Sequence, residues 1–169
     1  MDINIRLSEE KDIDDIMAAV KYAQEYFKNA GIDQWQDGYP NRESIASDIQ
    51  RGESYIFESD GKMIATAAIS FRGESTYDKI YDGEWLSDYP YTVVHRVAVS
   101  EGNKGKGISH EIMKFAEKIS KERNIKSMKI DTHEDNKVMR SMLEKNGYTY
   151  CGIIYLESGD TRVAYEKLI

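Results

Sequence analysis

The chain has 169 residues, 40% of them hydrophobic, which suffices for one well-buried core, so we expect a single domain over residues 1–169. Its net charge of −7 without any basic run argues against nucleic acid as a partner, and its one cysteine, Cys151, excludes a disulfide scaffold and predicts no metal cluster. No apolar run approaches a membrane span or a secretory leader, so we expect a cytoplasmic protein with no membrane partner.

The first half of the chain carries alternating strand and helix signals. After Ser8, a helix-capping residue type, apolar side chains recur at helical spacing as far as Gly31 and predict a long amphipathic helix. Asp60-Gly61 is a strong signal for a tight hairpin turn. The predicted elements are a strand at residues 3–7, a helix at 9–31, a shorter helix at 42–50, and hairpin strands at 55–57 and 63–71.

Two large aromatic residues, Trp35 and Tyr39, lie in the polar loop between the predicted helices. Aromatic side chains in such loops often form a small satellite core, because one end of the ring is buried for packing alone. The alternative is that they line the site of an acceptor molecule. We therefore treat both as candidate substrate-binding residues.

Residues 73–90, which we call the acidic segment, combine carboxylates with aromatic side chains. Its acidic residues are Glu74, Asp78, Asp82, Glu84 and Asp88, and its aromatic residues, spaced four apart, are Tyr77, Tyr81, Trp85 and Tyr89. Gly83 and Pro90 argue against one continuous helix. The segment is either a solvated flap or an acceptor-side insertion that attracts ammonium groups. In the second case Tyr81 and Trp85 would contact the substrate.

An apolar strand leads into an amphipathic helix through a turn of lysines and glycines. The side chains on one face of the strand are Val93, His95, Val97 and Val99, and those on one face of the helix are Ile108, Ile112, Phe115 and Ile119. The period changes from two to 3.6 within the glycine segment, so the helix begins there.

The first turn of this helix is suited to an anion, because its N–H groups lack partners within the helix and carry the positive end of the dipole. Gly105 and Gly107 allow close approach of the main chain, while Lys104 and Lys106 add cationic donors. We expect a phosphate or pyrophosphate there; the alternative is a plain connection with solvated lysines. Both the P-loop and the dinucleotide pattern are absent, since His110 stands where the latter needs its third glycine.

The C-terminal half continues the alternation of strands and helices. The predicted elements are the strand that begins at Val93, a helix at residues 106–123, a strand at 126–132, a helix at 136–145, and strands at 150–156 and 162–167. The complete order, β-α-α-β-β-β-α-β-α-β-β, predicts an α/β domain with a mixed sheet.

Two stretches resemble the GNAT superfamily of N-acetyltransferases. Residues 104–109, KGKGIS, follow the strand end Val97-Ala98-Val99 and are similar to the acetyl-CoA signature Q/R-x-x-G-x-G/A, with Lys104 and Ser109 as departures. Residues 131–136, DTHEDN, and 145–148, KNGY, are similar to the family's later strand, its Asn-bearing helix and its closing G-[FY].

The resemblance implies a single-domain GNAT-like fold, with a mixed, mostly antiparallel sheet and about four helices. It also implies transfer of an acetyl group from acetyl-CoA to a primary amine. The acidic segment alone indicates a small cationic metabolite as this partner, and we expect a monomer or homodimer. The thioester carbonyl would be held by backbone amides of a strand splayed from its neighbour by a bulge. The implied cofactor-binding residues are Val97, Ala98, Val99, Lys104, Gly105, Lys106, Gly107, Ile108, Ser109 and Asn136.

Acetyl transfer requires a base that removes a proton from the amine. His95 lies two residues before Val97, on the same face of the predicted strand, and histidine has an unperturbed pKa near ~6.5. His133 is the rival catalytic residue, and either histidine could equally be a packed or exposed side chain without a role.

Leu143 occupies the position, seven residues after Asn136, where the resembling family often places a tyrosine acid. Because a thiol has a pKa of about 8.5, the thiolate can leave without an acid, and Tyr148 and Tyr155 are candidate substitutes. Two other classes of function stay open. One is a non-catalytic acetyl-CoA-binding sensor or interaction module, and the other is a phosphate-binding domain unrelated to CoA.

Overall fold

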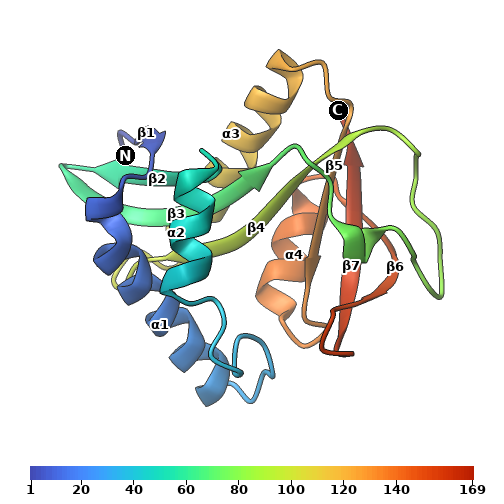
Figure 1. The fold of residues 1–169 in the computed structure, drawn as a ribbon, viewed down its shortest axis with the longest axis horizontal. Helices are drawn as coiled ribbons and strands as arrows, with labels where there is room; N and C mark the ends of the chain where they lie inside the picture. Colours follow the sequence, from blue (N-terminus) through green and yellow to red (C-terminus); the bar gives the residue numbers. More distant parts are fainter. The chain divides into compact units, whose positions relative to one another are not determined.

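A computed structural model describes all residues, 1–169, and contains seven strands and four α-helices in the predicted order (Figure 1). The strands are β1 (Asn4–Leu7), β2 (Ser54–Ser59), β3 (Lys62–Ser70), β4 (Tyr91–Val99), β5 (Ser127–Thr132), β6 (Thr149–Tyr155) and β7 (Thr161–Leu168). The helices are α1 (Ile13–Asn29), α2 (Arg42–Gln50), α3 (Ile108–Glu122) and α4 (Lys137–Lys145), and two 3-10 turns are η1 (Glu10–Asp12) and η2 (Ser75–Tyr77).

The chain forms two compact units. The first unit comprises Met1–Ile69 and Arg96–Ile112, and the second comprises Ser70–His95 and Met113–Ile169. The mixed sheet has the strand order β1-β2-β3-β4-β5-β7-β6, and β4 passes from the second unit to the first between His95 and Arg96. The predicted fold class is confirmed, whereas the bounds of the domain and of its insertion stay predictions.

In the first unit, β1, β2 and β3 are antiparallel. The hairpin between β2 and β3 closes through Asp60 and Gly61, whose φ values of 51° and 71° are both positive. This is the geometry that a two-residue turn needs to match the twist of its strands, so the hairpin prediction is confirmed. The core lies between this sheet and the first two helices, and its buried residues are Ile16, Ala19, Val20, Ile45, Ile56 and Ala98.

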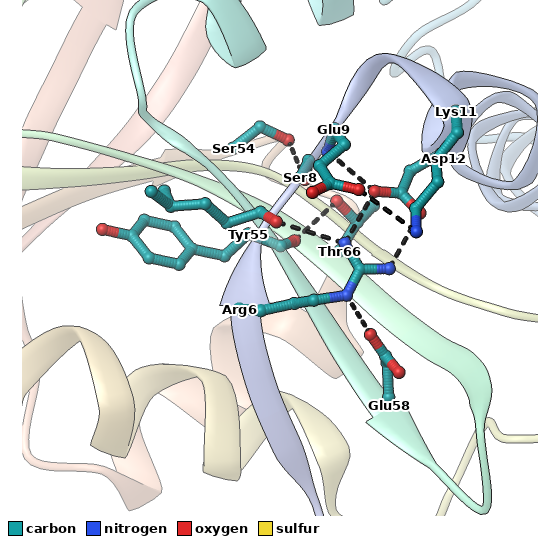
Figure 2. A network of polar contacts seen from close by, with 10 residues as sticks. Arg6, Ser8, Glu9, Lys11, Asp12, Ser54, Tyr55, Glu58 and Thr66 are labelled. Carbon is teal, nitrogen blue, oxygen red and sulfur yellow. Dashed lines mark hydrogen bonds and ion pairs between the residues drawn. The ribbon is translucent and has the colours of Figure 1, made fainter.

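The start of the helical segment after β1 differs from the prediction. Ser8 does not cap the helix; its hydroxyl is hydrogen-bonded to that of Ser54 at 2.7 Å. The cap is Glu9, whose N–H donates to Asp12 Oδ2 at 2.7 Å in a capping box. Arg6 completes this network, with two hydrogen bonds to Asp12 at 2.7 and 2.9 Å and one to Glu58 (Figure 2). The network joins β1 and β2 to the helix start.

In the second unit, β7 lies between β5 and β6 and is antiparallel to both. β4 is parallel to β5, with which it pairs only over Tyr91–Val93. One face of this sheet is covered by the acidic segment, and the buried cluster there contains Tyr77, Val93, Ile154 and Ala164. Figure 1 shows that segment, in green, beside β6.

Candidate active site

The connection from β4 to α3, residues 100–107, is here called the glycine loop. Gly102, Gly105 and Gly107 have φ values of 83°, 79° and 76°, which residues with a Cβ rarely adopt. An ideal Cβ on Gly105 or Gly107 would meet nothing within 4 Å, so this side of the loop is open to a ligand. The requirement for glycine therefore comes from the backbone conformation.

The N-terminus of α3 is exposed next to two lysines. The N–H of Glu111 donates to the carbonyl of Gly107 at 3.3 Å, and the amides of a helix's first turn point toward its N-terminal end. The ammonium of Lys104 lies over the ring of Tyr26, and partial burial lowers the pKa of Lys104. Lys106 is exposed, and its Nζ is 3.5 Å from Asn103 Oδ1. Amides and ammonium groups together make this helix start suitable for a pyrophosphate.

Within β4, Arg96 has a φ of 53°. This left-handed conformation is uncommon outside glycine and departs locally from an extended strand, as in a bulge. The ladder with β5 has already ended at Val93, although β5 continues to Thr132. The role of the amides after Arg96 in holding the thioester carbonyl stays a prediction. The period-two argument that placed His95 and Val97 on one face does not hold across this residue.

Arg96 is anchored to α2. Its Nε and Nη2 donate to the two carboxylate oxygens of Asp48, both at 2.6 Å, and its Nη1 donates to the hydroxyl of Tyr39 at 2.7 Å. Asp48 is 1% exposed. Burial alone would lower the pKa of Arg96, but the hydrogen bonds that it donates to Asp48, together with the negative charge of that carboxylate, outweigh burial and raise the pKa. Neither residue could be predicted from the sequence, because a lone arginine in a strand and an aspartate in a helix carry no local signal.

The two candidate histidines differ in their surroundings. His95 is half-buried on β4, and its Nε2 atom is buried. His133 follows β5, and its Nδ1 accepts the N–H of Asp135 at 3.0 Å. A neutral imidazole that accepts at Nδ1 carries its proton on Nε2, so His133 has no lone pair left for a substrate. This contact disfavours His133 as the base.

Comparison with known proteins identifies the family. The family model described as acetyltransferase (GNAT) family matches residues 17–148, which is most of the chain. The chain belongs to the GNAT family. It is therefore an acyltransferase that uses acetyl-CoA. The predicted family, enzyme class and cofactor are confirmed.

Solved structures agree with this assignment. A GNAT-family acetyltransferase from Streptococcus agalactiae 2603 is 37% identical, with a TM-score of 0.88, over 99% of this chain and 95% of that chain. PaiA N-acetyltransferase from Thermoplasma acidophilum, solved in complex with coenzyme A, is 19% identical, with a TM-score of 0.74 and complete coverage of both chains, which shows the shared fold. A curated relative, the uncharacterized N-acetyltransferase YesJ of Bacillus subtilis (strain 168), is 22% identical over 84% of this chain and 79% of its own.

No three His, Cys, Asp or Glu side chains come together as ligands for a metal ion. None of its helices combines the length and the apolar character that crossing a bilayer requires.

The GNAT position for a tyrosine acid is part of the core here. Leu143 is 0% exposed, and Tyr148 is also buried, with its hydroxyl 3.7 Å from the sulfur of Met128. Burial raises the pKa of Tyr148 further above its ordinary value, which makes it a poor proton donor at neutral pH. Tyr155 is exposed and its ring meets Tyr81 edge-on. Asn136 caps α4, accepting the N–H of Met139 at 3.2 Å.

The candidate substrate-binding aromatics fall into two groups. Trp35 packs against the core of the first unit and meets Phe27 edge-on, and Trp85 packs beside Tyr77, to whose carbonyl its Nε1 donates at 2.9 Å. Both indoles are only partly buried, so their role as substrate-binding residues stays a prediction. Tyr39 and Tyr81, by contrast, are 42% and 45% exposed and can meet a ligand.

The acidic segment is docked by its main chain onto β6. Tyr81 exchanges two backbone hydrogen bonds with Ile153, each of 2.8 Å. A Cβ on Gly83 would lie 1.9 Å from the carbonyl oxygen of Cys151, so only glycine permits this approach. The carboxylate-bearing residues between Tyr77 and Tyr89 stay exposed; they are Asp78, Asp82, Glu84 and Asp88. A fixed backbone therefore presents a row of negative charges.

A buried glutamate holds the same segment from β7. Glu166 is 0% exposed and accepts the N–H of Leu86 at 2.8 Å, together with the hydroxyls of Ser87 and Ser127 at 2.6 and 2.7 Å. Lys129, its neighbour across the β5–β7 ladder, is 4% exposed, with its ammonium 4.2 Å from the rings of Trp85 and Tyr91. Burial lowers the pKa of Lys129.

A second, partly buried polar contact ties the acidic segment to β5. The hydroxyl of Tyr77 donates to Asp131 Oδ2 at 2.6 Å. Burial raises the pKa of Asp131, and the hydrogen bond from Tyr77 opposes part of that rise. Neither Glu166 nor Asp131 was predicted, since acidic residues in strands usually mark a solvent-facing side.

Proposed function

We propose that this GNAT enzyme acetylates the primary amine of a small cationic metabolite. The observation that carries the proposal is the acidic segment, whose backbone is docked onto β6. Its exposed carboxylates are those of Asp78, Asp82, Glu84 and Asp88, and Lys79 is the only lysine in the segment. A fixed negative wall attracts an ammonium group and raises its local concentration. Exposed Tyr81 adds an aromatic face to which a cation can bind.

On the cofactor side, we propose that the glycine loop and the first turn of α3 bind the pyrophosphate of acetyl-CoA. The open face of Gly105 and Gly107, the helix amides and the two lysines support this assignment. The backbone amides of Val97–Val99, directly after the bulge, would hold the thioester carbonyl. Asn136 is kept as a proposed cofactor-binding residue.

The proposed chemistry is direct transfer within a ternary complex. An ammonium group must lose one proton before its nitrogen can attack, and His95 is our proposed base for that proton. The amine nitrogen then forms a bond to the acetyl carbon, and the amides stabilise the negative charge that develops on oxygen. The carbon–sulfur bond breaks, and the second proton of the nitrogen passes to the departing thiolate, which gives the amide and free CoA. The thiolate leaves without a protein acid, consistent with Leu143 and buried Tyr148.

The proposal is tested with a panel of primary amines, followed by release of free thiol from acetyl-CoA. We expect activity with small diamines or other cationic amines, and a KM for the amine that rises with ionic strength. Neutral amines of equal size are the matched control. Activity confined to neutral amines would contradict the acceptor class, and CoA binding without thiol release from any amine would support a non-catalytic module.

A further inference from the structure

We infer that the ion pair between Arg96 and Asp48 is a positioning device, which fixes the backbone amides that hold the thioester carbonyl. The inference rests on the proposed function for the role of Val97–Val99. Arg96 and Asp48 would touch neither the cofactor nor the acceptor, and would act through the conformation of β4.

Arg96 has a backbone conformation that its surroundings must stabilise. Its φ of 53° is disfavoured for a residue with a Cβ, and such a residue keeps this conformation only where its surroundings hold it. An unrestrained chain would relax toward an extended strand. The amides of the following residues would then turn away from their present directions.

Asp48 and Tyr39 restrain the side chain of Arg96. Two parallel hydrogen bonds of 2.6 Å join the guanidinium to both oxygens of Asp48, a bidentate geometry that fixes direction as well as distance. Tyr39 adds a third hydrogen bond of 2.7 Å. With Asp48 1% exposed, the pair is shielded from solvent, so it is held more tightly than a surface ion pair.

Helix α2 is itself anchored in the first unit. Asn41 caps this helix with a reciprocal box to Ser44, at 2.8 and 3.0 Å. Ile45, on the same helix as Asp48, shares a buried cluster with Ala98. The chain is therefore attached to α2 at Arg96 by charge and at Ala98 by packing, on both sides of Val97.

The consequence is catalytic. Amide donors stabilise an oxyanion only when they point at the position where the charge develops, and loss of one donor lowers kcat by about 10²–10³. A misaligned set should lower kcat by roughly 10- to 100-fold, with little change in the affinity for CoA, most of which would come from the separate glycine loop.

The test compares Asp48→Asn, Arg96→Ala and Arg96→Gly. Glycine adopts a positive φ without cost, so Arg96→Gly should retain more kcat than Arg96→Ala, although both lose the ion pair. Asp48→Asn should lower kcat, and combining it with Arg96→Gly should cost less than the product of the two single effects. The matched control is Arg42→Gln, which breaks an exposed ion pair of α2 with Asp14 and should leave kcat unchanged.

A second readout does not depend on finding the acceptor. With acetyl-CoA labelled with ¹³C at the carbonyl, amide hydrogen bonds should shift the bound carbonyl resonance in the wild type, and Asp48→Asn should move it toward the free value. Calorimetry with CoA and circular dichroism establish binding and folding. A folded Asp48→Asn protein with unchanged kcat, or with an unchanged carbonyl resonance, overturns the inference. Absence of thiol release from the wild type with every amine, while the carbonyl shift responds, would refute only the proposed function.

Discussion

Replacing Glu166 with glutamine should loosen the acidic segment from the body of the second unit. The carboxylate accepts three hydrogen bonds, two of them from Leu86 and Ser87 in the segment and one from Ser127 in β5. Glutamine keeps the shape of the side chain but has one acceptor oxygen, and its NH₂ group faces donors. At least one buried donor therefore loses its partner, and Lys129 loses its neighbouring negative charge.

The magnitude follows from these contacts. A hydrogen bond to a charged group contributes about 1.5–3 kcal/mol. Removing one partner from a buried charged network costs about 3–5 kcal/mol. We expect the free energy of unfolding to fall by about 3 kcal/mol, the lower end of that range, because glutamine still accepts one hydrogen bond. For a chain of this size each kcal/mol lowers Tm by roughly 2–4 °C, so Tm should fall by roughly 6–12 °C.

Urea unfolding and thermal melts measure the global effect, and hydrogen exchange at the amide of Leu86 measures the local one. Ser87→Ala should show a smaller loss, since it removes one of the three hydrogen bonds. Glu84→Gln is the matched control, because Glu84 lies exposed in the same segment. A Glu166→Gln protein within about 1 kcal/mol of wild type, with unchanged exchange at Leu86, would refute the role of this carboxylate.

The other predictions concern the cofactor site, the base, the acceptor wall and the partly buried Asp131. Gly107→Asp should lower CoA affinity many-fold in calorimetry while circular dichroism stays native, and Gly159→Asp, at a positive φ in the turn between β6 and β7, should leave that affinity unchanged. His95→Ala should lower kcat/KM by about 10²–10⁴ and flatten the acid limb of the pH profile; an unchanged profile would return attention to His133. Because burial raises the pKa of Asp131 above its unfolded value, wild type should lose stability as the pH rises between these two values, and urea unfolding of Asp131→Asn should show no such loss. The triple variant Asp78→Asn, Asp82→Asn and Glu84→Gln should raise the KM for the acceptor and weaken its dependence on salt, while the KM for acetyl-CoA stays constant. An unchanged acceptor KM at low salt would leave the cationic acceptor without support.

Elements with a local cause could be predicted from the sequence. The turn at Asp60-Gly61 could be predicted because its two positive φ values require such residues. The bounds of α2 agree with the predicted 42–50. The start of α3 could be predicted from the change of hydrophobic period beside Gly107. The long first helix was predicted, but its cap was misplaced, because Ser8 found a partner in Ser54, far away in the chain.

Features with distant causes could not be predicted in this way. The bulge at Arg96 depends on Asp48, 48 residues away, and the docking of Leu86 depends on Glu166, 80 residues away. The sequence does not distinguish a buried charged residue from a solvated one, since hydrophobic periodicity depends only on apolar side chains. The four-residue spacing of aromatics in the acidic segment likewise suggested a helical face, whereas the segment has only one 3-10 turn.

This difference explains why the cofactor site can be predicted from the sequence more readily than the acceptor site. The proposed pyrophosphate site uses backbone amides and glycines of one continuous stretch, residues 104–109, so a short motif can encode it. The acidic segment, by contrast, owes its position to Glu166, Asp131 and the main chain of β6, none of which is near it in sequence. Substitutions there can change the acceptor without altering the cofactor motif. Relatives that share the glycine loop should therefore be compared at these anchoring residues before the same acceptor is assigned to them.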